Sequence, residues 1–279
     1  FEESDTVLSM PEDYPRPRVM DHKGKNINKI INAEKYSLIK DLAQSYKTSV
    51  FTLMSAVLGI LLRRYTGQEN INIGFPILGR NDSNAQQMVG MFIDTSIMKL
   101  SVETDLDFGQ YLEQVSSEIL SSIKMSGIGL NSIIETVNPA RRTDNTELFQ
   151  VLINMTDFTI NENSLQGLKT AVIEDIHQDS KYDFTFYITE EGQGLHLRLN
   201  YYSSVYSQET AQLILNQYLY LMDEITRNSS KKVGQYKLSN KNSVCETDIP
   251  SDIEQFTPLF DKAQTNIRNN VDKIRLKLG

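Results

Sequence analysis

Residues 49–67, SVFTLMSAVLGILLRRYTG, contain the longest apolar stretch of the chain and decide its fold class. They predict a helix over 48–66, which Thr48 and Ser49 can cap and Gly67 can end. The stretch is apolar on nearly every side until Arg63 and Arg64, as expected of a helix buried inside a globular core. Its apolar part, Val50–Leu62, falls short of the roughly 20 residues that cross a membrane.

Helices and strands are predicted to alternate irregularly around this buried helix. Asn32 can cap an upstream helix over 32–47. Hydrophobic periodicity predicts strands over 71–77 and 91–100, an amphipathic helix over 107–124, a strand buried on both faces over 148–155, a hairpin of 182–189 with 195–202, and a last helix over 207–226. The predicted class is α/β, with a mixed β-sheet packed by helices.

The two ends of the chain are predicted to differ from its middle. Prolines at positions 11, 15 and 17 favour an extended lead-in over residues 1–20. Residues 228–247 are rich in Ser, Asn and Lys, which predicts a solvated linker before a short helix near 257–269. The opening FEESD has neither a start methionine nor a signal-peptide pattern. We therefore expect a cytoplasmic globular piece whose beginning was set by a cut.

Composition excludes several classes of partner. The 279 residues suffice for one large domain or two small ones, and 39% of them are apolar. The 28 basic and 36 acidic residues leave a net charge of −8, which argues against nucleic acid as a partner. The one cysteine, Cys245, excludes an internal disulfide and nearly every cysteine-based metal site.

A search for catalytic residues returns little. The histidines, His22, His177 and His196, are neither adjacent nor at i, i+4 spacing, so a metal triad is possible in space but is not expected. No G-x-S-x-G turn marks a nucleophile, although a Ser/His/Asp triad stays open. Gly127-Ile128-Gly129 follows a helix, which favours a turn over a phosphate-binding loop. From the residues alone we predict an α/β domain with no visible catalytic or metal site.

Six ordered segments resemble motifs in the second half of the condensation domains of nonribosomal peptide synthetases. They are MPEDYPRP (10–17), SVFTLMSA with YTGQE (49–56 and 65–69), IGFPILGR (73–80), VGMFIDT (89–95), LFQV (148–151) and SKYDFT (180–185). The resemblance covers residues 8–240. Residues 257–274 more weakly resemble the opening of an adenylation domain.

The resemblance implies a fold and partners. Condensation domains are chloramphenicol acetyltransferase-like: two α/β lobes enclose a tunnel. This chain would supply the C-terminal lobe over residues 21–228, and 229–279 would be a linker and the start of an adenylation-domain-like segment. The implied partners are the N-terminal lobe of the same domain, peptidyl carrier proteins and a neighbouring adenylation domain, with no nucleic acid and no membrane. Phosphopantetheine would arrive on the carrier proteins, and the lobe would bind no cofactor of its own.

The resemblance also implies which residues line the tunnel and its floor loop. They are Gly74, Pro76, Gly79, Arg80, Gly90, Phe92, Asp94, Thr95 and Asp183. The three glycines would let a pantetheine arm approach the backbone closely. Arg80 would anchor a phosphate or a carboxylate, or else form a structural ion pair between the lobes. Asp183 would brace the hairpin or contact the substrate.

Departures from the family pattern leave two functions open. The catalytic HHxxxDG motif, which belongs to the other half of the domain, does not occur in the chain, so we predict the isolated chain to be inactive. Met125–Asn131 replaces the family's "HqdvPFe" stretch, and Asp94 stands where the family usually has Asn. The chain is therefore half of an amide-forming domain, or a carrier-docking scaffold from a degenerate condensation or epimerisation domain. The absence of paired histidines disfavours a free-standing acyltransferase.

Overall fold

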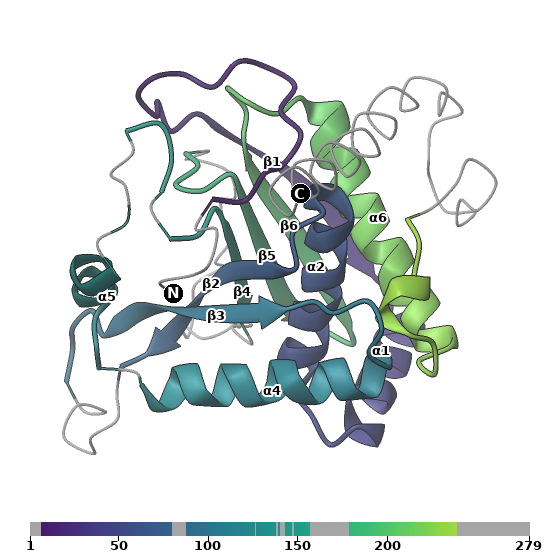
Figure 1. Cartoon of the computed structure of the whole chain (residues 1–279). Helices are drawn as coiled ribbons and strands as arrows, with labels where there is room; N and C mark the ends of the chain where they lie inside the picture. Colours follow the sequence, from purple (N-terminus) through teal and green to yellow (C-terminus); the bar gives the residue numbers. More distant parts are fainter. Residues whose placement is uncertain are drawn as a thin grey trace, which may run out of the picture.

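A mixed six-stranded sheet organises the protein (Figure 1). The computed structural model describes residues 7–79, 88–125, 127–137, 139, 143–146, 148–156 and 179–238. The strand order is β1-β6-β5-β4-β2-β3. Strand β4 is parallel to β2 and β5, and the other neighbours are antiparallel. The strands are β1 (Gly24–Ile31), β2 (Asn70–Leu78), β3 (Ile93–Ser101), β4 (Val151–Thr156), β5 (Phe184–Glu191) and β6 (Gly194–Tyr202).

Four helices cover one face of this sheet: α1 (Ala33–Ser45), α2 (Val50–Thr66), α4 (Phe108–Lys124) and α6 (Gln208–Arg227). As predicted, α2 is the core helix and contacts the other three. The Ser49 hydroxyl accepts a hydrogen bond from the Thr52 N–H at 3.0 Å. Gly67 ends the helix at a φ of 72°, a left-handed conformation that favours glycine.

A smaller apolar cluster lies on the opposite face. Ile97 and Leu152 point away from the helices, because their strand neighbours Met98 and Val151 are in the main core. They pack with Leu148, Phe149 and Tyr182, and this cluster supports the short helix α5 (Leu130–Val137).

The predicted α/β class and mixed sheet are confirmed, and two elements were not foreseen. Strand β1 pairs with residues 195–202 of β6 at the sheet edge, yet only its Ile27 and Ile31 are buried. Helix α5 was missed because it spans barely two turns. The strand expected over 148–155 begins at Val151, and its second half is only partly buried, so the prediction of burial on both faces is wrong there.

The expected solvated linker is wrong for its first part. The short 3-10 helix η1 (Val233–Gln235) packs beside the start of α4, and both Val233 and Tyr236 are buried there. The Val233 N–H donates to the Leu106 carbonyl at 2.9 Å. The Tyr236 ring meets the edge of Phe108, with their centroids 5.9 Å apart. Residues 239–279, which include Cys245, the expected helix over 257–269 and the adenylation-like segment, lie outside the described residues.

No single helix in the described part of the chain is long and apolar enough to cross a membrane. Helices α1 and α2 meet that criterion only when taken together, and they are bent by 97° at their junction.

Candidate functional site

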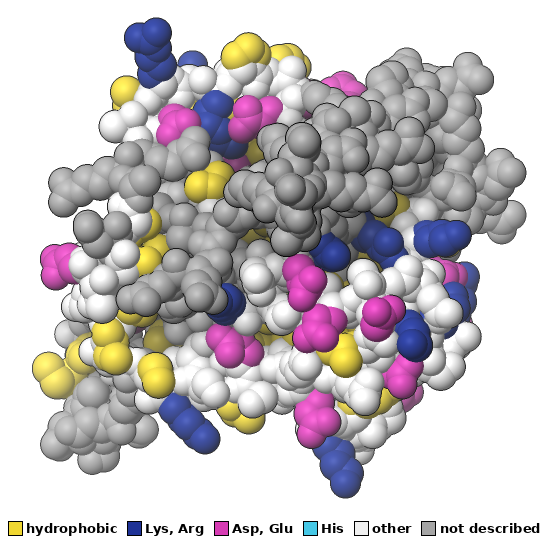
Figure 2. Space-filling model, viewed as in Figure 1, with side chains coloured by type: hydrophobic (Ala, Val, Ile, Leu, Met, Phe, Trp, Pro, Cys, Tyr) yellow, Lys and Arg dark blue, Asp and Glu magenta, His cyan; other side chains and the backbone are white. Residues whose placement is uncertain are grey.

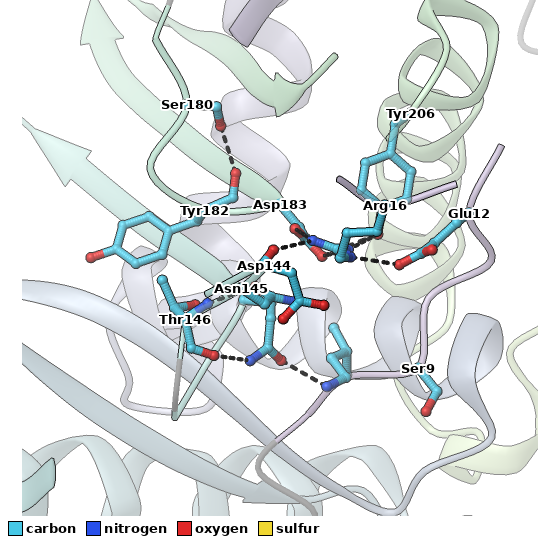
Figure 3. A network of polar contacts seen from close by, with 12 residues as sticks. Ser9, Glu12, Arg16, Asp144, Asn145, Thr146, Ser180, Tyr182, Asp183 and Tyr206 are labelled. Atoms are coloured by element: carbon cyan, nitrogen blue, oxygen red, sulfur yellow. Dashed lines mark hydrogen bonds and ion pairs between the residues drawn. The ribbon is translucent and has the colours of Figure 1, made fainter. Parts of the chain in front are cut away.

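The lead-in, described over residues 7–20, is attached to the sheet by a buried ion pair (Figure 3). The Arg16 guanidinium donates to both carboxylate oxygens of Asp183, with Nη1–Oδ1 at 2.8 Å and Nη2–Oδ2 at 2.7 Å. Only 9% of the Arg16 side chain and 1% of the Asp183 side chain are exposed. Two parallel N–H···O bonds in a buried setting make this a strong, geometrically specific contact.

Further hydrogen bonds complete this ion pair. The Tyr206 hydroxyl donates to Asp183 Oδ2 at 3.1 Å, and Glu12 accepts from Arg16 Nε at 2.8 Å. The Asp183 N–H donates to the Gln150 carbonyl at 2.9 Å. The side chain of Gln150 accepts from the Leu8 N–H at 2.7 Å. The lead-in is thereby held against the beginnings of β4 and β5.

The electrostatics of this cluster favour a charged pair beside a neutral phenol. Burial alone would lower the pKa of Arg16, but its hydrogen bonds to Asp183 and the negative charge there outweigh burial and raise it. Burial, together with the charge of Asp183, raises the pKa of Tyr206 well above its ordinary value. Tyr206 therefore remains a hydrogen-bond donor to the carboxylate, and the geometry suits a structural brace.

The glycines expected along the tunnel make close contacts within the chain itself. A Cβ at Gly74 would lie 2.2 Å from the Phe149 ring, so the ring packs directly on the backbone there. A Cβ at Gly79 would lie 2.6 Å from the Phe92 carbonyl, which accepts the Gly79 N–H at 2.7 Å. Internal packing thus accounts for glycine at both positions.

Five more of the predicted site residues lie at or near the connected end of the β2–β3 hairpin: Pro76, Gly90, Phe92, Asp94 and Thr95. Pro76 pairs with Thr95 across the two strands. Asp94 Oδ1 accepts from the Thr95 N–H at 2.7 Å. Gly90 and Phe92 lie in the segment before β3, and Arg80 falls outside the described residues.

The structure does not bring Asp183 to this end. The register aligns Gly74 with Leu152 and Leu152 with Thr185. Because Gly79 is five residues beyond Gly74, and Asp183 two residues before Thr185, they are about seven residues, or roughly 23 Å, apart along the strands. Sequence reasoning therefore grouped two separate regions, and it missed Arg16 and Tyr206 as partners of Asp183.

An apolar tip, which we define as Leu78, Val89, Met91 and Ile93, projects from this end of the hairpin. In Figure 2, hydrophobic side chains gather at the lower left, on the same side of the molecule as the end of β2 and the beginning of β3 in Figure 1. Val89 is 104% exposed and Met91 is 93% exposed. Apolar side chains grouped and exposed in this way are typical of an interaction surface.

The described residues contain no group of three His, Cys, Asp or Glu side chains that could hold a metal ion. His22 lies 3.2 Å from the Ser180 carbonyl through Nδ1, while His177 lies outside the described residues.

Comparisons with known proteins agree with this architecture. The family model for the condensation domain matches residues 1–244. The chain is 26% identical to surfactin synthase subunit 1 of Bacillus subtilis (strain 168) over 252 residues, covering 90% of this chain and 7% of the relative. It is also 26% identical to gramicidin S synthase 2 of Brevibacillus brevis over 275 residues, covering 98% of this chain and 6% of the relative. The chain thus spans less than a tenth of either relative.

Solved structures show the same fold. A four-domain nonribosomal peptide synthetase, holo-AB3403, superposes with a TM-score of 0.78 at 23% identity, over 85% of this chain and 19% of that one. The condensation domain of the Monacolin K polyketide synthase MokA gives 0.71 at 16% identity, over 82% of this chain and 52% of that one. With the family model matching most of its length, this chain belongs to the condensation-domain family.

Proposed function

We propose that the chain is the C-terminal lobe of a nonribosomal peptide synthetase condensation domain. In this proposal it forms one wall of a tunnel in which a carrier-bound amine attacks a carrier-bound acyl thioester. A C–N bond forms, the C–S bond breaks, and the released thiol takes up the proton that the amine loses. Carrier proteins deliver both substrates on phosphopantetheine arms in the cytoplasm, and residues 229–279 form a linker and the start of a neighbouring adenylation domain.

One observation carries the proposal. The X-domain from teicoplanin biosynthesis superposes over 85% of this chain but only 54% of its own, with a TM-score of 0.77. The MokA condensation domain gives a similar half match, at 52% of that chain. A lobe equal to half of such a domain, with no HHxxxDG motif in its sequence, fits the half that does not carry the motif.

The apolar tip and the hairpin end supply the surfaces that this role needs. The tip offers exposed apolar area for an N-terminal lobe, and Pro76, Thr95 and Asp94 would line the tunnel beside it. Arg80 would anchor an anionic group there. A wall of this kind orients the two reactants, while the general base, worth typically about 10²–10⁴-fold, would come from the other lobe.

A carrier-docking scaffold from a degenerate condensation or epimerisation domain is the second candidate. The observation that favours it is the Met125–Asn131 segment, which lacks the histidine, aspartate and proline of the family motif. Such a lobe would bind carriers without supporting amide formation.

Reconstitution separates the two candidates. The full chain is combined with an N-terminal condensation lobe that carries HHxxxDG, and amide formation from loaded carriers is followed by mass spectrometry. We expect product only when both lobes are present, and tight binding of a phosphopantetheine-loaded carrier only in their complex. Tight carrier binding by this chain alone, without product from the pair, would favour the scaffold.

A further inference from the structure

Strands β1, β6, β5 and β4 turn a polar surface away from the helices. In these strands, residues such as Leu199, Phe186 and Ile153 point into the main core on the helix side of the sheet. Because side chains alternate along a strand, the residues next to them point to the opposite side. The register places these residues in three rows, which we call the polar face: Asn26, Asn200, Thr185 and Leu152; Asn28, Arg198, Tyr187 and Asn154; and Ile30, His196, Thr189 and Thr156.

Arg198 and Tyr187 occupy the middle row of the polar face. The Arg198 guanidinium lies over the Tyr187 ring, with its carbon 4.6 Å from the ring centroid. Both side chains are half-buried. Stacking on an aromatic ring orients the planar guanidinium and leaves its N–H edge able to donate. The Asn28 and Asn154 positions flank this pair in the same row.

The charge on the polar face differs from that of the whole chain. The chain has a net charge of −8, yet the three rows contain an arginine and a histidine and no carboxylate. Among the residues that the structure describes, no carboxylate forms an ion pair with Arg198. The oriented cation thus has only a tyrosine ring as its described side-chain partner.

The strand arrangement also sets this surface apart. Strands β4 and β5 are parallel, and parallel strands are usually covered by apolar residues on both faces. Here Asn154, Thr156 and Thr189 stand on the second face instead, and the Thr156 and Thr189 hydroxyls are 3.3 Å apart. The second face of this parallel pair is therefore polar rather than apolar.

The geometry points to an anion-binding site in which Arg198, oriented by Tyr187, binds a carboxylate or a phosphate diester through paired N–H···O bonds. The choice of ligand rests on the proposed function, which offers two sources of this anion. One is the phosphate of a pantetheine arm, and the other is the carboxylate of an acidic acyl substrate.

Calorimetric titration of the full 279-residue chain tests the site with two matched pairs of ligands. The first pair is the methyl ester of 4′-phosphopantetheine, which is a phosphodiester like the carrier-bound arm, and pantetheine. The second pair is N-acetyl-aspartyl and N-acetyl-asparaginyl pantetheine. We expect the anionic member of one pair to bind at least about tenfold more tightly, as one charge-assisted contact allows. The pair that shows this preference identifies the source of the anion.

Four variants test whether the preference for the anionic ligand depends on the polar face. Arg198→Gln should abolish it, Tyr187→Leu should weaken it, and Tyr187→Phe, which keeps the ring, should retain it. Lys25→Gln removes the same charge from the other face of β1 and should leave the preference unchanged. Far-ultraviolet circular dichroism and thermal unfolding of each variant check that the fold is kept.

Two results would overturn the site: equal affinity or no binding within both pairs, or a preference that survives Arg198→Gln. The reconstitution assay reports separately on the proposed function. A preference that depends on Arg198 without amide formation keeps the anion site and removes the proposed function. Amide formation without the anion preference supports the proposed function and overturns the anion site.

Discussion

Arg16 and Asp183 lie 167 positions apart in the sequence and form a bidentate ion pair beneath the surface, at 2.8 and 2.7 Å. Arg16 belongs to the proline-rich lead-in, and Asp183 immediately precedes β5. The pair therefore fastens a segment without helix or strand to the start of the central strands.

Removing one partner of this pair should be costly. Arg16→Met leaves the Asp183 carboxylate buried without its cation, and we expect the free energy of unfolding to fall by about 3–5 kcal/mol. The double variant Arg16→Met/Asp183→Leu should recover much of this loss, because no unpaired charge remains. Urea denaturation measures both. Lys23→Met breaks the exposed pair with Asp21, at 2.9 Å, and should lower the free energy of unfolding far less than Arg16→Met does, because solvent screens that pair. An equal loss in Arg16→Met and Lys23→Met would contradict the structural role of the buried pair.

Gly74 should not tolerate a methyl group. A Cβ there would lie 2.2 Å from the Phe149 ring, which is itself buried, so Gly74→Ala should destabilise the protein by about 1–3 kcal/mol. Phe149→Leu should restore part of the loss when it is combined with Gly74→Ala. Gly90→Ala is the control, because its Cβ would meet the Phe92 ring at 3.2 Å in an exposed segment. A lower melting temperature for Gly90→Ala than for Gly74→Ala would contradict the close packing at Gly74.

Alkaline pH should unfold the protein through its buried tyrosines. Burial raises the pKa of Tyr65, Tyr111 and Tyr218 in the folded state, whereas an unfolded tyrosine titrates near about 10. The stability that these neutral phenols contribute is fully present below the unfolded value and is lost as the pH rises above it. Each buried tyrosine adds a slope of up to about 1.4 kcal/mol per pH unit to the decline.

Tyr218→Phe isolates one of these contributions. It also removes the hydrogen bond that the Tyr218 hydroxyl donates to the Met54 carbonyl at 3.0 Å. Urea denaturation across a pH series should show a shallower decline for Tyr218→Phe than for the unsubstituted protein. Tyr14→Phe, at an exposed position, should keep the original slope. Identical slopes in all three proteins would show that burial of the phenol does not govern alkaline unfolding.

The first residues after α6 should stabilise the lobe. Tyr236 is fully buried against Phe108, and its hydroxyl donates to the Asn228 carbonyl at 2.8 Å. We expect Tyr236→Ala to lower the free energy of unfolding by about 3–5 kcal/mol. Lys237→Ala, at the exposed neighbouring position, should change it by less than about 0.5 kcal/mol. A small effect at Tyr236 would restore the prediction of a solvated linker.

The apolar tip should bind another lobe without supporting this one. Val89 and Met91 are almost entirely exposed, so Val89→Ser/Met91→Ser should leave the free energy of unfolding within about 0.5 kcal/mol of its original value. The same double variant should weaken association with an N-terminal condensation lobe by about tenfold or more, as removal of buried apolar anchors does. Surface plasmon resonance measures the affinity. Unchanged affinity would show that the apolar tip does not form the contact with the N-terminal lobe.

Sequence reasoning succeeded where the determining forces are local. The caps at Asn32 and Ser49, and the apolar run of α2, predicted these helices close to their observed bounds, because capping and burial act within a few turns. Strand β1 and helix α5 escaped, because only two residues of β1 are buried and α5 is short. The expected site was only partly right, because sequence motifs that are all typical of a family need not lie close together in the folded chain, and Asp183 lies away from the other predicted residues.

The sequence by itself determined the α/β class, the buried position of α2 and the membership in the condensation-domain family. Only the tertiary structure decided that Asp183 faces Arg16, that Tyr236 is buried, and that Arg198 stacks on Tyr187 on the polar face. The physical reason is that helix caps and apolar periodicity act over a few residues. Ion pairs, ring contacts and strand register join residues that are far apart along the chain, and local sequence patterns do not predict which of them come into contact.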